Sequence, residues 1–344
     1  MATLKEIAAM AGVNTSTVSK ALRGSNDIKA ETCARIRAIA DELGYTYRQP
    51  KSTDAGTTIG LIFPELGSQY YNDIQQAFRR RMDRLGFRTI ILLTDFDRTR
   101  ELRAIESLLG NGSQVGGICC LTENTDHLRQ MRTMVERDGL PFLLICAHED
   151  IDFCDSISVN HTMGAALAVE HLIELGHKKI AYIGEENTVT RETSFRATMR
   201  EHGLPLPAEY VLRRTDRFEL CGYLGMQQLL ASGDPPTAIF AAYDNIAIGA
   251  MRAMHEAGLR IPEDISIIGI DANPTSQYVW PALTSVTSPT GDIGELASVL
   301  LTKRMEGRHT TSFQSIRLCP TLKLGETTAP PRAAKLAGVV KSSL

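Results

Sequence analysis

From Thr58 onward the chain alternates between short apolar runs and segments with helical spacing, and this alternation leaves few folds open. The apolar runs of the first series are TIGLIFPEL, RTIILLTDF, VGGICCLT and PFLLICAH, and a second series contains KKIAYIGE, TAIFAAY and ISIIGIDA. Runs that are apolar on both faces and joined by crossover helices predict parallel sheets covered on both sides. Two such series in succession predict an α/β protein with two lobes.

The ends of these runs are where a ligand is expected. Open α/β sheets bind ligands beyond the carboxyl ends of their strands, and a cleft between two lobes is a favoured pocket. Polar residues stand at several of these ends, among them Asp95, Cys146 and His148. For these three residues, lining a pocket and lying in an ordinary loop are both open.

The first residues follow a different pattern, two short helices with a tight corner between them. Thr3 and Glu6 have the spacing of a capping box at the start of the first helix. Gly12 interrupts that helix, and Asn14 can cap a second one over Thr15–Leu22. Short hydroxyls and a cation on the outward face of the second helix suit base edges and phosphates in a DNA major groove; these residues are Thr15, Ser16, Thr17, Ser19 and Lys20.

An ordinary helical hairpin with a solvated face is the alternative, because such hairpins are common. A third amphipathic helix, about Ala30–Leu43, favours a DNA-binding unit, since three short helices can close a small core. Residues 1–51 also contain eight Lys and Arg against five Asp and Glu, a net charge of +3, whereas the whole chain carries −3. Positive charge is therefore concentrated at one end, as contact with nucleic acid requires.

Composition narrows the remaining function classes. A length of 344 residues predicts two or three compact units, and no apolar run is long enough to cross a bilayer. Seven cysteines, an odd number, do not resemble a disulfide framework, and the chain opens on a polar helix rather than a signal peptide. We therefore expect a cytoplasmic protein with free thiols. The sequence has no P-loop, G-x-S-x-G, H-E-x-x-H or C-x-x-C motif, so we expect no enzyme, no catalytic residue, no metal site and no cofactor.

LKEIAAMAGVNTSTVSKAL followed by ETCARIRAIADELGY resembles the DNA-binding headpiece of the lac repressor (LacI/GalR) family of bacterial transcription regulators. The resemblance implies that Thr15, Ser16 and Lys20 lie where the family reads operator bases, with Thr17 and Ser19 on phosphates. Arg48, in the following linker, could also hold a phosphate. The predicted DNA contacts are Thr3, Asn14, Thr15, Ser16, Thr17, Ser19, Lys20, Arg23 and Arg48.

The linker departs from the family pattern. Family members usually carry a short hinge helix here, whose leucines wedge into the minor groove and bend the operator. This chain is shorter at that point and has no leucine between Tyr45 and Ile59. The resemblance therefore does not extend to the minor-groove wedge.

The resemblance continues to about Pro330, through HLIELGHKKIAYIG, PPTAIFAAYDNIAIGAM, GLRIPEDISIIGIDANP and PALTSV. It implies a bilobed receptor like a periplasmic sugar-binding protein, with three crossovers between the lobes. The implied boundaries are a helix-turn-helix domain at 1–46, a linker at 47–57, an effector-binding and dimerisation domain at 58–330 and a tail at 331–344. Within 58–330, lobe 1 covers about 58–155 and 288–318, and lobe 2 covers about 156–287 and 319–330.

The resemblance also assigns individual residues to the effector pocket. Arg191 begins R-E-T-S-F, which matches the family's R-x-x-G-F except that Ser194 replaces the glycine, and Asp271 matches a carboxylate that accepts bonds from effector hydroxyls. An arginine opposed by an aspartate is a natural clamp for a polyol. The predicted effector contacts are Tyr70, Tyr71, Arg191, Phe218, Tyr243 and Asp271.

Two of these side chains, and the neighbouring Asp244, have structural alternatives. Asp244, next to Tyr243, can serve as the N-cap of a helix. Tyr71 can pack in a lobe core, and Arg191 can pair with Glu192 or Glu201 on the surface.

The favoured function is a ligand-responsive transcriptional repressor that binds a pseudo-palindromic operator as a homodimer, with a sugar or sugar derivative between its lobes. Lobe rotation can raise or lower operator affinity, so inducer and corepressor are both open. The tail lacks the leucine heptads that would make a tetramer. The rival is a transport-type solute-binding protein or a sugar-modifying enzyme on the same fold, which would have a signal peptide and lack residues 1–45.

Overall fold

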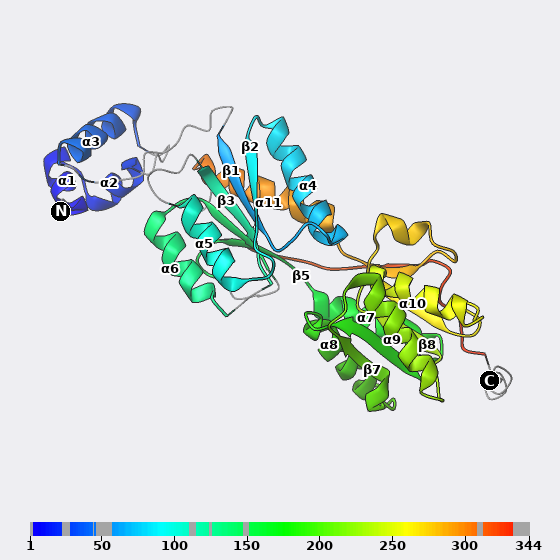
Figure 1. The fold of residues 1–344 in the computed structure, drawn as a ribbon. Coiled ribbons are helices and arrows are strands. Elements are labelled where there is room, and N and C mark those ends of the chain that lie inside the picture. Colours follow the sequence, from blue (N-terminus) through cyan, green and yellow to red (C-terminus); the bar gives the residue numbers. More distant parts are fainter. Residues whose placement is uncertain are drawn as a thin grey trace. The chain divides into compact units, whose positions relative to one another are not determined.

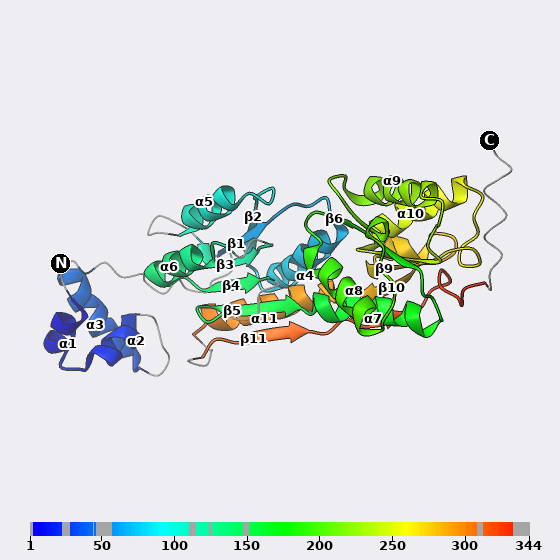
Figure 2. The ribbon, with the colours of Figure 1, turned by 90° about the horizontal axis from the view of Figure 1, so that it is seen from below.

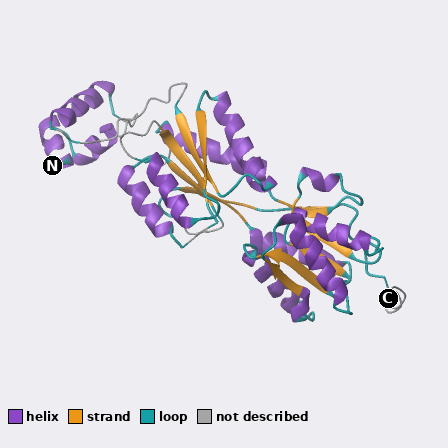
Figure 3. Cartoon of the chain, viewed as in Figure 1, coloured by secondary structure: helices purple, strands orange, loops and turns teal. Residues whose placement is uncertain are grey.

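The computed structural model describes residues 3–22, 28–43, 45, 57–109, 115–123, 126–146, 151–307 and 312–332, coloured along the chain in Figure 1. Arg23, Arg48, His148 and residues 47–56 of the predicted linker lie outside this range. Helices alone form the described chain up to Glu42, and its strands begin at Thr58 (Figure 3). The predicted fold class, a helical headpiece followed by parallel-sheet lobes, is confirmed.

Three helices form the headpiece: α1 (Leu4–Ala11), α2 (Thr15–Leu22) and α3 (Ala30–Glu42). Thr3 and Glu6 make the predicted capping box, and Gly12 ends α1 with a left-handed φ of 62°. Apolar side chains from all three helices, including the fully buried Ile7 and Ile36, form its core. The headpiece therefore has the three-helix core expected of residues 3–43.

The chain divides into two compact units, residues 1–158 with 290–316 and residues 159–289 with 317–344. The sheet of the first unit has the strand order β11-β5-β4-β3-β1-β2. Its strands are β1 (Thr58–Phe63), β2 (Arg88–Leu93), β3 (Val115–Leu121), β4 (Phe142–Ile145), β5 (Asp155–Val159) and β11 (Ser315–Leu318). In Figures 1 and 2, one face of this sheet is covered by α4 (Gln69–Arg84) and α11 (Thr290–Met305), the other by α5 (Arg98–Leu108) and α6 (Leu128–Asp138).

The second unit repeats this arrangement with the strand order β12-β10-β9-β8-β6-β7. Its strands are β6 (Ile180–Glu185), β7 (Val211–Arg214), β8 (Ala238–Ala241), β9 (Ser266–Asp271), β10 (Thr284–Thr287) and the antiparallel β12 (Leu322–Lys323). The helices α9 (Phe218–Ala231) and α10 (Asp244–Glu256) lie on one face, α7 (His161–Glu174) and α8 (Val189–Glu201) on the other (Figure 2). Short 3₁₀ turns occupy Ala208–Tyr210 and Pro274–Gln277.

Two glycines set the distance between α9 and α10. A Cβ at Gly222 would lie 1.8 Å from the carbonyl oxygen of Ile246, and one at Gly249 would lie 1.9 Å from that of Glu219. Because no side chain fits at either position, the two helix backbones can pack in direct contact. This contact fixes the starts of α9 and α10 beside each other.

Parallel pairing brings the carboxyl ends of β6, β8 and β9 to one edge of the second sheet. Ile183 pairs with Ala241, and Phe240 pairs with Ile268, so the three strands run in register. Side chains that directly follow these strands are therefore neighbours, although they are far apart in the sequence. The candidate site of the second unit is built at this edge.

Candidate functional sites

The outward face of α2 carries the polar residues that the sequence predicts. Val18, Ala21 and Leu22 are buried in the headpiece core, whereas Thr15, Ser16 and Lys20 are exposed. Thr17 and Ser19 are half-buried. An amphipathic helix of this kind presents hydroxyls and one cation to solvent along a single face.

Asn14 organises the start of that helix. Its Oδ1 accepts the backbone N–H of Thr17 at 2.7 Å, the Oγ of Ser16 at 2.6 Å and the Oγ1 of Thr17 at 2.7 Å. The predicted cap is therefore confirmed, and the same oxygen also aligns two of the predicted DNA-contacting hydroxyls. Thr3, another predicted contact, has its hydroxyl and N–H engaged with Glu6 in the capping box of α1.

In the second unit, Arg191 faces Asp271, its predicted partner in the clamp. Its Nη1 donates to the carbonyl oxygen of Ala242 at 2.7 Å, and its Nη2 stands 3.6 Å from Oδ1 of Asp271. The two side chains are 13% and 8% exposed. The alternative surface pair with Glu192 does not form, because Glu192 binds Arg196 and Arg213 instead.

Asp271 is held in an unusual backbone conformation. Its φ is 104° and that of Ala272 is 51°, values that residues other than glycine adopt rarely. Its Oδ1 accepts the hydroxyl of Ser288 at 2.8 Å. The turn and the Ser288 contact together hold the carboxylate, whose Oδ1 faces Arg191.

Two aromatic residues lie beside this clamp. The rings of Phe218 and Tyr243 meet edge to face with centroids 6.2 Å apart, and the guanidinium of Arg191 lies 6.0 Å from the Tyr243 ring. Arg217 covers the Phe218 ring at 4.4 Å. The structure therefore brings together four of the six predicted effector residues: Arg191, Phe218, Tyr243 and Asp271.

Sequence reasoning missed Glu185, the buried residue that ends β6. Its carboxylate accepts the Phe218 backbone N–H at 2.6 Å, the Nε of Arg217 at 3.3 Å and the hydroxyl of Tyr243. One buried carboxylate therefore ties together the starts of α9 and α10, through the backbone of Phe218 and the side chain of Tyr243. A carboxylate at the end of an otherwise apolar run, in IAYIGE, was the available sequence signal.

His161, the first residue of α7, was missed as well. Burial, and secondly the charge of Arg191, lower its pKa from 6.5 to about 3. The imidazole therefore stays neutral and adds no charge beside Arg191.

Tyr70 and Tyr71 belong to the first unit, at the start of α4. Tyr71 is buried, its hydroxyl binds Oε1 of Glu123 at 2.9 Å, and its ring packs against Tyr70 and Phe96. Burial and Glu123 raise the pKa of Tyr71 well above its ordinary value, so the hydroxyl remains protonated. Within this unit the Tyr71 ring packs in the core, as the structural alternative for this residue predicted.

The capping expectation for Asp244 was wrong by one position. Tyr243 is the N-cap of α10, and Asp244 is the first helical residue. Its carboxylate turns away from its own helix and accepts the N–H of Asn273 at 2.7 Å, because the segment after β9 lies within reach.

Two further residues at strand ends have surroundings of their own. Asp95 pairs with Arg100 on the exposed surface, whereas Cys146 is buried in an apolar cluster.

A repressor of Erwinia tasmaniensis, the HTH-type transcriptional repressor PurR, is 32% identical over 330 residues, which is 94% of this chain and 95% of that protein. The chain belongs to the lacI family. Residues 3–47 match the family described as bacterial regulatory proteins of the lacI family, and residues 169–328 match the periplasmic binding protein-like domain. The lacI-family headpiece thus coincides with α1–α3, and the binding-protein match covers most of the second unit.

Solved structures of lacI-family regulators share the fold. The complex of the transcriptional regulator CelR with cellobiose superposes with a TM-score of 0.68 and 26% identity, and covers 95% of this chain and 100% of that one. The lac repressor dimer, bound to operator and an anti-inducer, gives a TM-score of 0.69 and 26% identity, with coverage of 95% and 99%. Among the described residues, no helix of this lacI-family chain is long and apolar enough to span a membrane, and no cluster of His, Cys, Asp and Glu could hold a metal ion.

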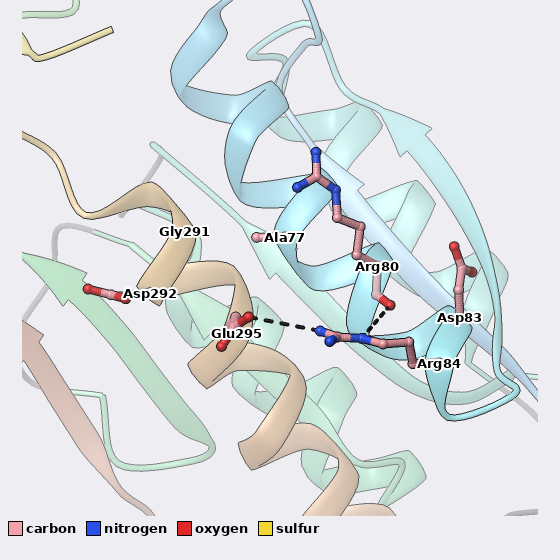
Figure 4. Close-up of a pocket in the computed structure, with 7 residues that line it drawn as sticks. All are labelled: Ala77, Arg80, Asp83, Arg84, Gly291, Asp292 and Glu295. Atoms are coloured by element: carbon pink, nitrogen blue, oxygen red, sulfur yellow. Dashed lines mark hydrogen bonds and ion pairs between the residues drawn. The ribbon is translucent and has the colours of Figure 1, made fainter. Parts of the chain in front are cut away.

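A surface groove lies in the first unit between α4 and α11 (Figure 4). Arg84 there stands 4.0 Å from Glu295, with both side chains exposed, so this pair contributes little to stability. None of the predicted effector residues lines the groove, whose residues are Ala77, Arg80, Asp83, Arg84, Gly291, Asp292 and Glu295. The groove is therefore separate from the candidate site of the second unit.

Proposed function

We propose that this lacI-family regulator binds a pseudo-palindromic DNA operator as a homodimer in the cytoplasm, and that a sugar or sugar derivative controls this binding without undergoing catalysis. The effector binds at the carboxyl ends of β6, β8 and β9, against Arg191, Asp271, Phe218 and Tyr243. Operator contacts are made by the outward face of α2.

The arrangement of Arg191 carries the effector proposal. Among the described residues, its guanidinium makes one hydrogen bond, to Ala242, and its distance of 3.6 Å from Asp271 exceeds hydrogen-bond length. A hydroxyl group can donate to the carboxylate and accept from the guanidinium, so a polyol fits both groups at once. The edge-to-face ring pair beside them offers an apolar wall to a sugar ring.

Exposed apolar residues support the homodimer. Tyr278 and Trp280 in the second unit are 89% and 87% exposed, and Ile90 and Leu93 are exposed on β2, an edge strand of the first sheet. Tyr278 and Trp280 lie two residues apart in the chain, and neighbouring exposed aromatic side chains favour contact with another protein. A two-fold dimer presents two copies of α2 to two half-sites, which matches a pseudo-palindromic operator.

The test begins with selection of duplexes from a random DNA pool by the full-length protein at low salt. Fluorescence anisotropy then measures operator affinity with D-ribose, cellobiose, glucose 6-phosphate or hypoxanthine added. We expect a sugar to change the affinity, and Arg191→Ala and Asp271→Ala to abolish that change while operator binding stays intact. Arg196→Ala, five residues further along α8 and paired with Glu192, is the matched control and keeps the response.

Two outcomes would contradict the proposal in different ways. Failure to select any duplex would remove the DNA-binding function and favour the solute-binding rival. A normal sugar response in both clamp variants would mean that the effector site lies elsewhere.

A further inference from the structure

Asp244 is a fully buried carboxyl group that spans two segments of the second unit. Its Oδ1 is hydrogen-bonded to the hydroxyl of Ser285, on β10, at 2.6 Å, and its Oδ2 accepts the N–H of Asn273 at 2.7 Å. Gly269 on β9 leaves room for it, because a Cβ there would lie 2.5 Å from Oδ1. The carboxyl group therefore occupies a space that the sheet keeps open for it.

These bonds converge on the turn that follows β9. The N–H of Ala272 donates to Oγ of Ser285 at 3.0 Å, and Ser285 is itself bound to Asp244. Two consecutive N–H groups, those of Ala272 and Asn273, are thus held by Asp244, one directly and one through a hydroxyl. Asp271 and Ala272 carry the two positive φ values of the turn, a conformation that persists only where its surroundings impose it.

The same residue is close to both groups that hold Arg191. Ala242, whose carbonyl oxygen accepts from Nη1, lies two residues before Asp244 in the chain. Asp271, which faces Nη2, begins the turn that Asp244 holds. We propose that Asp244 is a positioning residue, which holds the 271–273 turn so that the Asp271 carboxylate faces Arg191 in the effector site.

The effect of Asp244 on the effector response rests on the proposed function, since both concern the same site. Its effect on the 271–273 turn can be tested without an effector. Burial, followed by the charge of Asp271, raises the pKa of Asp244 to about 8, so the group carries a proton at neutral pH. Because Oδ2 accepts the Asn273 N–H, this proton lies on Oδ1, which donates it to Oγ of Ser285. An asparagine is then a close substitute, because its amide oxygen can accept from Asn273 and its NH₂ can donate to Ser285. Alanine can do neither.

The experiment compares hydrogen–deuterium exchange by mass spectrometry in the full-length wild type, Asp244→Ala and Asp244→Asn. We expect Asp244→Ala to raise the exchange rate of the peptide containing 271–273 at least about tenfold while the β6 and β8 peptides keep theirs, because only the turn loses its acceptors. Asp244→Asn should restore slow exchange. Thr284→Val is the control: Thr284 is a buried neighbour on β10 whose hydroxyl binds Gly325 and Thr328 and not the turn.

A second measurement follows the consequence for the effector. In the anisotropy assay with D-ribose and cellobiose as probes, Asp244→Ala should lose the sugar-dependent change in operator affinity, and Asp244→Asn and Thr284→Val should keep it. Slow exchange of 271–273 in Asp244→Ala would overturn the proposal, as would equal acceleration across the whole unit. If no sugar acts even on the wild type, the proposed function fails, while the exchange experiment still decides the role of Asp244.

Discussion

Single side chains determine much of what the two sites present. In the headpiece, one amide oxygen of Asn14 accepts three hydrogen bonds, so the hydroxyls of Ser16 and Thr17 have fixed positions before any DNA is bound. In the second unit, the carboxylate of Glu185 binds both the backbone of Phe218 and the hydroxyl of Tyr243. In each site, therefore, one side chain holds several of its neighbours in place.

Lys20 and Ser16 test the operator contacts. Each change to alanine should weaken operator binding by about 1–3 kcal/mol if the side chain reaches a base edge. Binding to non-specific duplex should fall much less, which anisotropy titrations on the two DNAs will measure. Equal loss on both DNAs would assign the residue to a phosphate contact instead.

The buried carboxyl of Asp244 predicts a specific dependence of stability on pH. Because burial and Asp271 raise its pKa from 3.8 to about 8, the folded chain keeps this proton in a range where the unfolded chain has released it. The stability it contributes is complete below about pH 4 and is lost as the pH rises through about 8. The side chain at this position cannot titrate in the Asp244→Asn variant. The unfolding free energy of this variant, relative to that of the wild type, should therefore increase as the pH rises.

Guanidinium chloride unfolding of both proteins at about pH 5 and about pH 9 measures this difference. A difference in unfolding free energy that does not change with pH would show that Asp244 titrates near its ordinary value.

At the scale of elements, the strength of the apolar signal decided which parts could be predicted. The strands β3, β6 and β8 are buried throughout, and their sequences stood out as uninterrupted apolar runs. The strand β7, VLRR, lies at a sheet edge and is only partly buried, so no such run marks it. The helix α9 packs against both α10 and β6, which leaves its apolar residues without a clear single stripe.

The site divides in the same way. Arg191 and Asp271 stand in short motifs that a family resemblance can carry, whereas Glu185 and His161 acquire their surroundings only when distant segments meet. The bonds of Glu185 reach residues 33 and 58 positions away. No local pattern contains that information.

The glycine contact between α9 and α10 predicts a stability effect at this scale. Gly222→Ala would place a methyl group against the Ile246 carbonyl oxygen, so the helices must separate. We expect a loss of about 1–3 kcal/mol in the free energy of unfolding, measured by chemical denaturation. Gly291→Ala, in a helix but with open space around it, is the control and should leave stability unchanged or slightly higher.

For the whole molecule, the prediction is a dimer. Sedimentation equilibrium should give twice the mass of the chain, and Tyr278→Glu combined with Trp280→Glu should shift the protein toward monomer, because charges would replace its most exposed aromatic residues. Leu324→Glu, another exposed apolar position in the same unit, is the control. A tetramer in the wild type, or an unaltered dimer in the double variant, would contradict the assignment.

The discontinuity of the two units has a consequence for how the protein is made. The helix α11 packs on α4 so closely that a Cβ at Gly294 would lie 2.4 Å from the carbonyl oxygen of Ile74, yet it leaves the ribosome only after residues 159–289 have been translated. Until then the nascent first unit lacks one of the two helices that cover this face of its sheet, and the apolar surface beneath α11 is open to chaperones or to other nascent chains.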